Sequence, residues 1–250
     1  MIRFLLLFIA IGQFASVGIP QALGLGQGLA TRPETGGIPP ELPLGIFFMI
    51  IWNVIFVLYL INAVVAVRRG SFVDTYIGAP LVIAGAMNIV WILSAQFIHS
   101  IWTDFILLFP VMVTAWEASR RLDRIGGFDG TNARLLLCSL TGMLSGWITT
   151  AVTISVPDVV REVLGHDASD FVWPYLWLTL AVGAALAFVF ARYISQSLWY
   201  FVGLGWGIAG IAANTMTRLD MPLLGYIAAA FGLVLLYARL TRGADGARAS

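Results

Sequence analysis

Residues 42–69 are the stretch that most restricts what this chain can fold into. From Leu44 to Val67 every residue is apolar, aromatic or glycine except Asn53 and Asn62. A water-soluble protein cannot hide a helix that is apolar on all sides. With a rise of ~1.5 Å per residue, the stretch also exceeds the ~20 residues that a bilayer core demands. It predicts a transmembrane helix, and the two arginines that follow predict that its end is cytoplasmic.

The composition extends this prediction to the whole chain. Of 250 residues, 60% are hydrophobic and 11% are charged, as in a polytopic membrane protein and unlike a soluble domain. The net charge of +1 and the absence of a basic surface exclude a nucleic-acid partner. All fourteen basic residues are arginine, so no lysine can form a Schiff base. The single cysteine, Cys138, allows no intrachain disulfide.

Hydropathy and arginine placement together predict an all-α bundle of about eight transmembrane spans. We expect them at about Ile2–Ile19, Leu44–Val67, Gly78–Ile98, Ile101–Ala118, Arg134–Val156, Trp173–Phe190, Leu198–Thr215 and Pro222–Leu240. This count places eleven arginines on one side and only Arg32, Arg161 and Arg218 on the other, which predicts cytoplasmic N- and C-termini. The first apolar segment also fits a cleaved signal peptide, but its length favours retention.

Three segments outside the spans carry expectations of their own. Residues 20–43 form a long outer loop rich in glycine and proline, which fits a lid or binding loop. Residues 157–172 are amphipathic and acidic and predict a short helix on the outer surface. Residues 242–250 are expected to be a disordered tail.

The sequence offers little for catalysis or for metal binding. His99 and His166, its two histidines, both fall in outer loops far apart in sequence, so we expect no metal site and no enzyme. Gly205–Gly210 matches G-x-G-x-x-G, but it lies in an apolar span with no preceding strand. Glycines four residues apart, Gly142 with Gly146 and Gly203 with Gly207, predict close helix–helix contact instead.

The tryptophans fall into two groups. Those at span ends belong to the aromatic belts of a membrane protein. Four others lie well inside their spans: Trp52, Trp91, Trp147 and Trp206. Asn53, Asn88 and Thr150 are near three of them in sequence. One interpretation is an aromatic cavity for a flat apolar ligand, covered by the outer loop. Ordinary core packing is the alternative, and the sequence leaves both open.

These residues resemble the translocator protein family of tryptophan-rich sensory proteins (TspO/MBR), in particular its longer, eight-span relatives. The family motifs correspond here to Pro39-Pro40, to Trp52 with Phe56, to Met87–Trp91, and to Trp147 with Ala151. The chain departs from the family in carrying Met143-Leu144 for a Pro-Tyr pair and in lacking the loop tryptophan. The likeness covers residues 1–156 as a five-helix unit, and residues 173–241 would add three helices.

The resemblance implies a pocket between helices for tetrapyrroles, sterols or similar flat ligands. Together with the residue pattern it yields these expected ligand-binding residues: Trp52, Asn53, Phe56, Asn88, Trp91, Trp147 and Thr150. We expect no cofactor, a tetrapyrrole being conceivable only as ligand. The partners expected are the lipid bilayer of the cell (inner) membrane and a small apolar ligand, with a homodimer left open. A secondary transporter and a membrane-embedded enzyme are the competing functions.

Overall fold

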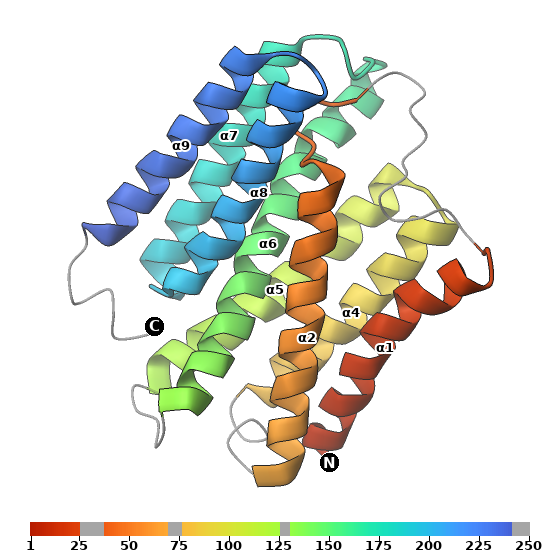
Figure 1. Ribbon diagram of the computed structural model, residues 1–250, viewed down its shortest axis with the longest axis vertical. Coiled ribbons are helices and arrows are strands. Elements are labelled where there is room, and N and C mark those ends of the chain that lie inside the picture. The colour runs from red at the N-terminus through yellow and green to blue at the C-terminus, as the bar shows by residue number, and fades with distance from the viewer. Residues whose placement is uncertain (26–37, 70–76, 126–130, 242–250) are drawn as a thin grey trace.

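The computed structural model describes residues 1–25, 38–69, 77–125 and 131–241, which form helices and the short connections between them (Figure 1). The helices are α1 (Ile2–Ala22), α2 (Gly45–Arg69), α4 (Gly78–Phe97), α5 (Ile101–Ile125), α6 (Thr131–Leu164), α7 (Val172–Val189), the π-helical turn η1 (Phe190–Ile194), α8 (Leu198–Thr217) and α9 (Pro222–Leu240). No strand occurs in these ranges. The all-α prediction is confirmed.

Seven of these helices are long and apolar enough to cross a membrane: all the α-helices except α8. α8 itself has 20 residues, the length that a bilayer core needs, but four glycines and two tryptophans lower its hydropathy. Consecutive helices run in opposite directions (Figure 1). Short described connections, such as residues 98–100 between α4 and α5, require this of neighbouring helices. The chain is therefore a polytopic helical bundle, as its hydropathy predicts.

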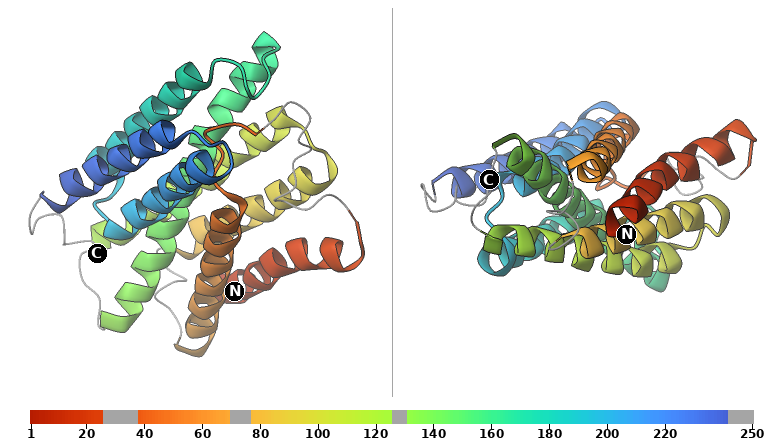
Figure 2. Two further views of the ribbon diagram at one scale, coloured as in Figure 1. Left: turned by 45° about the horizontal axis from the view of Figure 1, so that its top comes forward. Right: turned by 90° about the horizontal axis from the view of Figure 1, so that it is seen from below.

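Helix α6 lies at the centre of the bundle. It packs against α2, α5, α7 and most extensively α8, and it is the most deeply buried of the candidate spans. Figures 1 and 2 show α1 and α4 on one side of it and α7 and α9 on the other. Two groups of helices thus meet on α6.

Small residues explain why α6 and α8 can pack so closely. A Cβ placed on Gly146 of α6 would overlap the carbonyl oxygen of Tyr200, and one on Gly203 of α8 would lie 2.5 Å from the Met143 carbonyl oxygen. The two backbones are therefore in direct contact. The glycine pairs do serve helix packing, as their four-residue spacing predicts.

Two predicted boundaries differ from the structure. Residues 157–164 are not a separate outer helix but the last turns of α6, which continues past Pro157. Membrane helices tolerate an internal proline more readily than soluble helices do. Helix α1 extends through Pro20 to Ala22, so the outer loop begins later than expected. Most of that loop, and the predicted tail 242–250, lie outside the described residues.

Candidate functional site

Three of the tryptophans inside the spans meet between helices α2, α4 and α6. Trp52 of α2 stacks on Trp91 of α4, with 5.7 Å between ring centroids and 28° between ring planes. Trp147 of α6 stands edge-on to Trp52 at 6.2 Å. Their side chains are 5%, 8% and 0% exposed, respectively. Residues that are 39 and 56 positions apart in sequence therefore form one buried group.

Phenylalanines complete this group on the α2 side. Phe48 and Phe56 lie one turn before and one turn after Trp52, a spacing that places all three on one helix face. Phe48 also contacts Trp147 edge-on at 5.8 Å, and Phe14 of α1 contacts Phe56 at 5.4 Å. We call the six rings the aromatic cluster: Phe14, Phe48, Trp52, Phe56, Trp91 and Trp147.

The tryptophans of the aromatic cluster have buried indole nitrogens that make no hydrogen bond to the described residues. The indole nitrogens of Trp52, Trp91 and Trp147 are all buried, and none has a hydrogen-bond acceptor within the described part of the chain. Trp116 instead donates to the hydroxyl of Thr149 at 3.2 Å, and Trp206 donates to the carbonyl of Phe47 at 2.8 Å. Unpaired buried donors are rare in folded proteins, so three in one cluster require an explanation.

An amide pair lies one turn from Trp91. The side-chain nitrogen of Asn88 on α4 donates to the side-chain oxygen of Gln13 on α1 at 2.9 Å. The remaining atoms of this pair, Asn88 Oδ1 and Gln13 Nε2, are buried without a partner among the described residues. Gly85 lets α1 approach α4 beside this pair, because a Cβ there would overlap Ile9 Cγ2 of α1. The predicted site residue Asn88 thus joins α1 to α4 beside the aromatic cluster.

Two predicted site residues lie elsewhere. Asn53 is exposed on the outside of α2 and donates to the carbonyl of Met49 at 2.8 Å. It follows Trp52 in sequence, but ~3.6 residues per turn rotate it ~100° away from that side chain. Thr150 donates to the Gly146 carbonyl at 3.2 Å and lies against α8, where a Cβ on Gly207 would overlap it. Neither residue makes a ring contact with the aromatic cluster.

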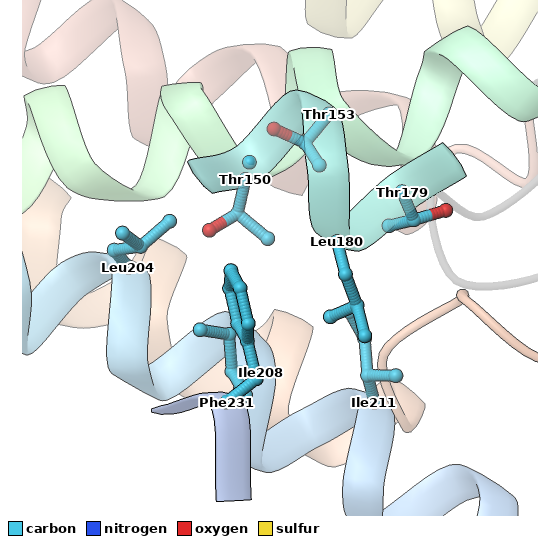
Figure 3. Close-up of a pocket in the computed structure, with 9 residues that line it drawn as sticks. Thr150, Thr153, Thr179, Leu180, Leu204, Ile208, Ile211 and Phe231 are labelled. Carbon is cyan, nitrogen blue, oxygen red and sulfur yellow. The ribbon is translucent and has the colours of Figure 1, made fainter. Parts of the chain in front are cut away.

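Thr150 instead lines a small cavity among α6, α7, α8 and α9 (Figure 3). Its volume is about 20 Å³, close to the space of a single water molecule. The hydroxyl groups of Thr150 and Thr179 already donate hydrogen bonds to backbone carbonyls one turn earlier. The ring of Phe231 lines the cavity on the α9 side. This cavity is too small for an organic ligand.

A charge cluster that the sequence did not indicate lies at the C-terminal end of α6. Arg161 forms a double hydrogen bond with Glu41, the second contact being 3.1 Å, and both side chains are almost completely buried. The guanidinium also lies 4.0 Å from the ring of Tyr175. Burial raises the pKa of the Glu41 carboxyl above its ordinary 4.5, and hydrogen bonding to Arg161 opposes that rise.

This ion pair anchors the described end of the predicted outer loop. In residues 38–44, the backbone N–H of Leu44 donates to the Gly210 carbonyl at 2.9 Å, and Asn214 donates to the Pro39 carbonyl at 3.3 Å. The segment therefore docks on α8 and on the end of α6. Neither here nor elsewhere in the described ranges do three His, Cys, Asp or Glu side chains gather where a metal ion could be held.

Comparison with known proteins agrees with this architecture. A family model described as "TSPO-like protein" matches residues 41–241, which extends from Glu41 of the docked segment to the end of α9. The match includes helices α7 to α9 as well as the tryptophan-bearing helices α2, α4 and α6. No curated protein and no solved structure matches the chain. The family match covers most of the sequence, and the chain therefore belongs to the TSPO-like protein family.

Proposed function

We propose that this membrane protein binds a small, flat, largely apolar ligand at the aromatic cluster, in the service of sensing or transport. The observation that carries the proposal is the set of three buried indole N–H groups without acceptors. Each unpaired buried donor costs ~1–3 kcal/mol. A ligand that supplies acceptor atoms to these N–H groups would offset part of that free energy. A pure hydrocarbon has no acceptor and would not.

The chemistry of the aromatic cluster narrows the ligand further. Its unpartnered polar atoms, taken with those of the Gln13–Asn88 pair, are four donors and one acceptor. A matching ligand is therefore flat, to stack on indoles, and carries carbonyl, carboxylate or ether oxygens. Tetrapyrroles with carboxylate side chains meet this description, and so do smaller aromatic ketones.

The rings now fill the space between the helices, so binding requires some of them to separate. The Trp52–Trp91 stack joins α2 to α4, and Phe14 contributes the ring of α1. Helix α1 packs on α2 and α4, at the edge of the bundle (Figure 2). Ring–ring contacts can part without breaking backbone hydrogen bonds, which makes this side of the molecule the natural entrance.

The orientation in the membrane follows from charge. Arginines concentrate at the end of the bundle where α2, α5 and α9 finish, which we call the basic end: Arg68, Arg120, Arg121, Arg124, Arg192 and Arg239. We place the basic end at the cytoplasmic face of the cell membrane.

Tryptophan fluorescence of the detergent-purified protein tests the proposal. Anthraquinone and anthracene have the same flat skeleton, but only anthraquinone carries acceptor oxygens, so we expect saturable quenching by anthraquinone at lower concentration. Trp91→Phe should weaken that binding about tenfold, whereas Trp102→Phe, which changes a half-exposed ring on α5, should not. Protoporphyrin and a sterol extend the panel.

Equal quenching in wild type and Trp91→Phe, or no saturable quenching by any ligand, would show that the aromatic cluster is only core. Uptake of small polar solutes driven by an ion gradient in proteoliposomes would then become the leading function.

A further inference from the structure

A second hollow lies at the basic end, between α5 and the turn that follows α7. Its volume is about 240 Å³, several times the ~30 Å³ that one water molecule occupies in the liquid. Three arginines line it: Arg120 and Arg124 from α5 and Arg192 from η1. Segments about 70 residues apart in sequence thus direct cationic residues to one place.

The hollow exists because α7 does not end as an ordinary α-helix. Its last residues form the π-helical turn η1, in which the Ser195 N–H donates to the Phe190 carbonyl at 3.0 Å. The backbone is extended at Ser195, with φ −158° and ψ 155°, so the helical segment ends there before α8 begins at Leu198. Single π turns inside helices are frequent at functional sites.

The charges around the hollow favour an anion. Asp123 is the one carboxylate in its described lining, against three guanidinium groups. Glu117 holds Arg120 by two hydrogen bonds, from Nε at 2.7 Å and from Nη2 at 2.9 Å. A guanidinium has five N–H donors, so this contact fixes the orientation of Arg120 and leaves donors for a ligand.

The residues beside the hollow are of the types found at a membrane–water interface. Arg192 lies over the ring of Tyr193 at 5.6 Å, and Tyr193 is 67% exposed. Exposed tyrosines beside arginine at the end of a transmembrane helix mark the membrane–water interface. Basic pockets between transmembrane helices on the cytoplasmic side suit the phosphate of an anionic lipid.

We propose that Arg120, Arg124 and Arg192 form a binding site for a phosphate group at the basic end. Topology alone would explain arginines scattered over this face, but it would not require them to converge on one hollow. The phosphate can belong to the headgroup of an anionic phospholipid or to a free phosphate ester in the cytoplasm. The site is separate from the aromatic cluster, so either can fail without the other.

Native mass spectrometry of the full-length protein in detergent tests this site. Dioleoylphosphatidylglycerol is compared with dioleoylglycerol, which has the same chains and no phosphate. We expect saturable binding of phosphatidylglycerol and none of dioleoylglycerol. Arg192→Gln and Arg124→Gln should each weaken the affinity for phosphatidylglycerol about fivefold. Arg68→Gln, which removes an exposed arginine from α2 at the same end, is the matched control and should bind as wild type does.

Inorganic phosphate then separates the two sources. If millimolar phosphate displaces the lipid, the site accepts free phosphate; if it does not, the lipid headgroup is the ligand. Binding of dioleoylglycerol as tight as that of phosphatidylglycerol would overturn the proposal. Equal weakening by Arg68→Gln and by the pocket variants would overturn it too, because the attraction would then be general to the basic end.

Discussion

Where α6 meets α8, backbone touches backbone, whereas on the side of α6 that carries Trp147 the contacts are between large rings. The α6–α8 contact depends on glycines such as Gly146 and Gly203, at which no side chain could be added without moving a helix. The aromatic cluster instead spans the distance between α2, α4 and α6 with indoles whose N–H groups are unpaired. One interface is closed by backbone contact, and the other is filled by rings whose N–H groups have no acceptor among the described residues.

The difference assigns different roles to the two interfaces. Close backbone packing in lipid gains van der Waals contact that is lost as soon as the helices separate, so α6 and α8 should stay together. Ring contacts contribute ~0.5–1.5 kcal/mol per pair beyond area burial, and a ligand ring can replace them one by one. We therefore expect α6–α8 to be the rigid support and the aromatic cluster to be the part that moves.

The largest expected loss of stability comes from breaking the Glu41–Arg161 ion pair, which holds the segment before α2 against α6. Arg161→Met leaves the Glu41 carboxylate buried without its cation, and we expect a loss of about 4 kcal/mol in the free energy of unfolding. Unfolding in mixed detergent micelles measures this loss. The double variant Glu41→Gln with Arg161→Met removes the two charges of this pair and leaves only the Asp158 carboxylate, which lies 3.8 Å from Arg161 in wild type. It should recover much of the stability. A single variant as stable as wild type would contradict the anchoring role.

The same variant should respond to pH in a defined direction. Without Arg161 the pKa of Glu41 rises further above 4.5, because the strongest opposition to burial is lost and the Asp158 carboxylate nearby adds to the rise. The folded state then binds a proton that the unfolded state releases above about that pH. The stability of Arg161→Met should therefore be highest at or below pH 4.5 and fall as pH rises through the elevated pKa. The deficit relative to wild type should be smaller at low pH than at neutral pH.

The next effect tests the closed interface directly. Gly146→Ala places a methyl group against the Tyr200 carbonyl and 2.8 Å from the Leu204 nitrogen, so we expect about 3 kcal/mol of destabilisation. Gly205→Ala on α8 is the matched control, because a Cβ there meets nothing within 4 Å. It should be neutral or stabilise the protein by up to ~1 kcal/mol through helix propensity. Thermal unfolding by circular dichroism compares the two, and equal midpoints would show that the α6–α8 contact is not tight.

Much of this fold could be predicted from sequence because a membrane restricts the choices. A run such as residues 44–67 has only one stable structure in lipid, and the glycine spacing on α6 and α8 indicated their packing. Pro157 was misleading: a proline at the start of a polar stretch suggested a helix end, yet α6 continues to Leu164. Local composition shows where a helix could stop, but the tertiary neighbours decide whether it does.

The candidate site was predictable only in part, for geometric reasons. Trp52, Trp91 and Trp147 were found because an indole inside a span is unusual. Asn53 lies on the exposed side of α2, away from Trp52, because sequence neighbours on a helix point ~100° apart. The spacing of Phe48 before Trp52 could have found that ring. The Glu41–Arg161 pair could not have been found, because residues 120 positions apart are brought together only by the packed bundle.

The smallest effect distinguishes a satisfied indole from an unsatisfied one. Trp91 and Trp116 are both 8% exposed, so Trp→Phe removes a similar amount of buried ring surface at each position. Only Trp116 also loses a hydrogen bond, to Thr149, while Trp91 loses a donor that had no partner among the described residues. We expect Trp116→Phe to cost about 1 kcal/mol more than Trp91→Phe in the free energy of unfolding without ligand.

When a ligand such as anthraquinone is present, Trp91→Phe should become the variant that loses more stability relative to wild type. Trp91→Phe should lose much of the stabilisation that the ligand gives wild type, and Trp116→Phe should keep it. A ligand that binds only the folded state stabilises it by an amount that grows with the logarithm of its affinity. If Trp91→Phe were the costlier change without ligand, its N–H would already have a partner. The aromatic cluster would then be ordinary hydrogen-bonded core, and the reason to expect an acceptor-bearing ligand would disappear.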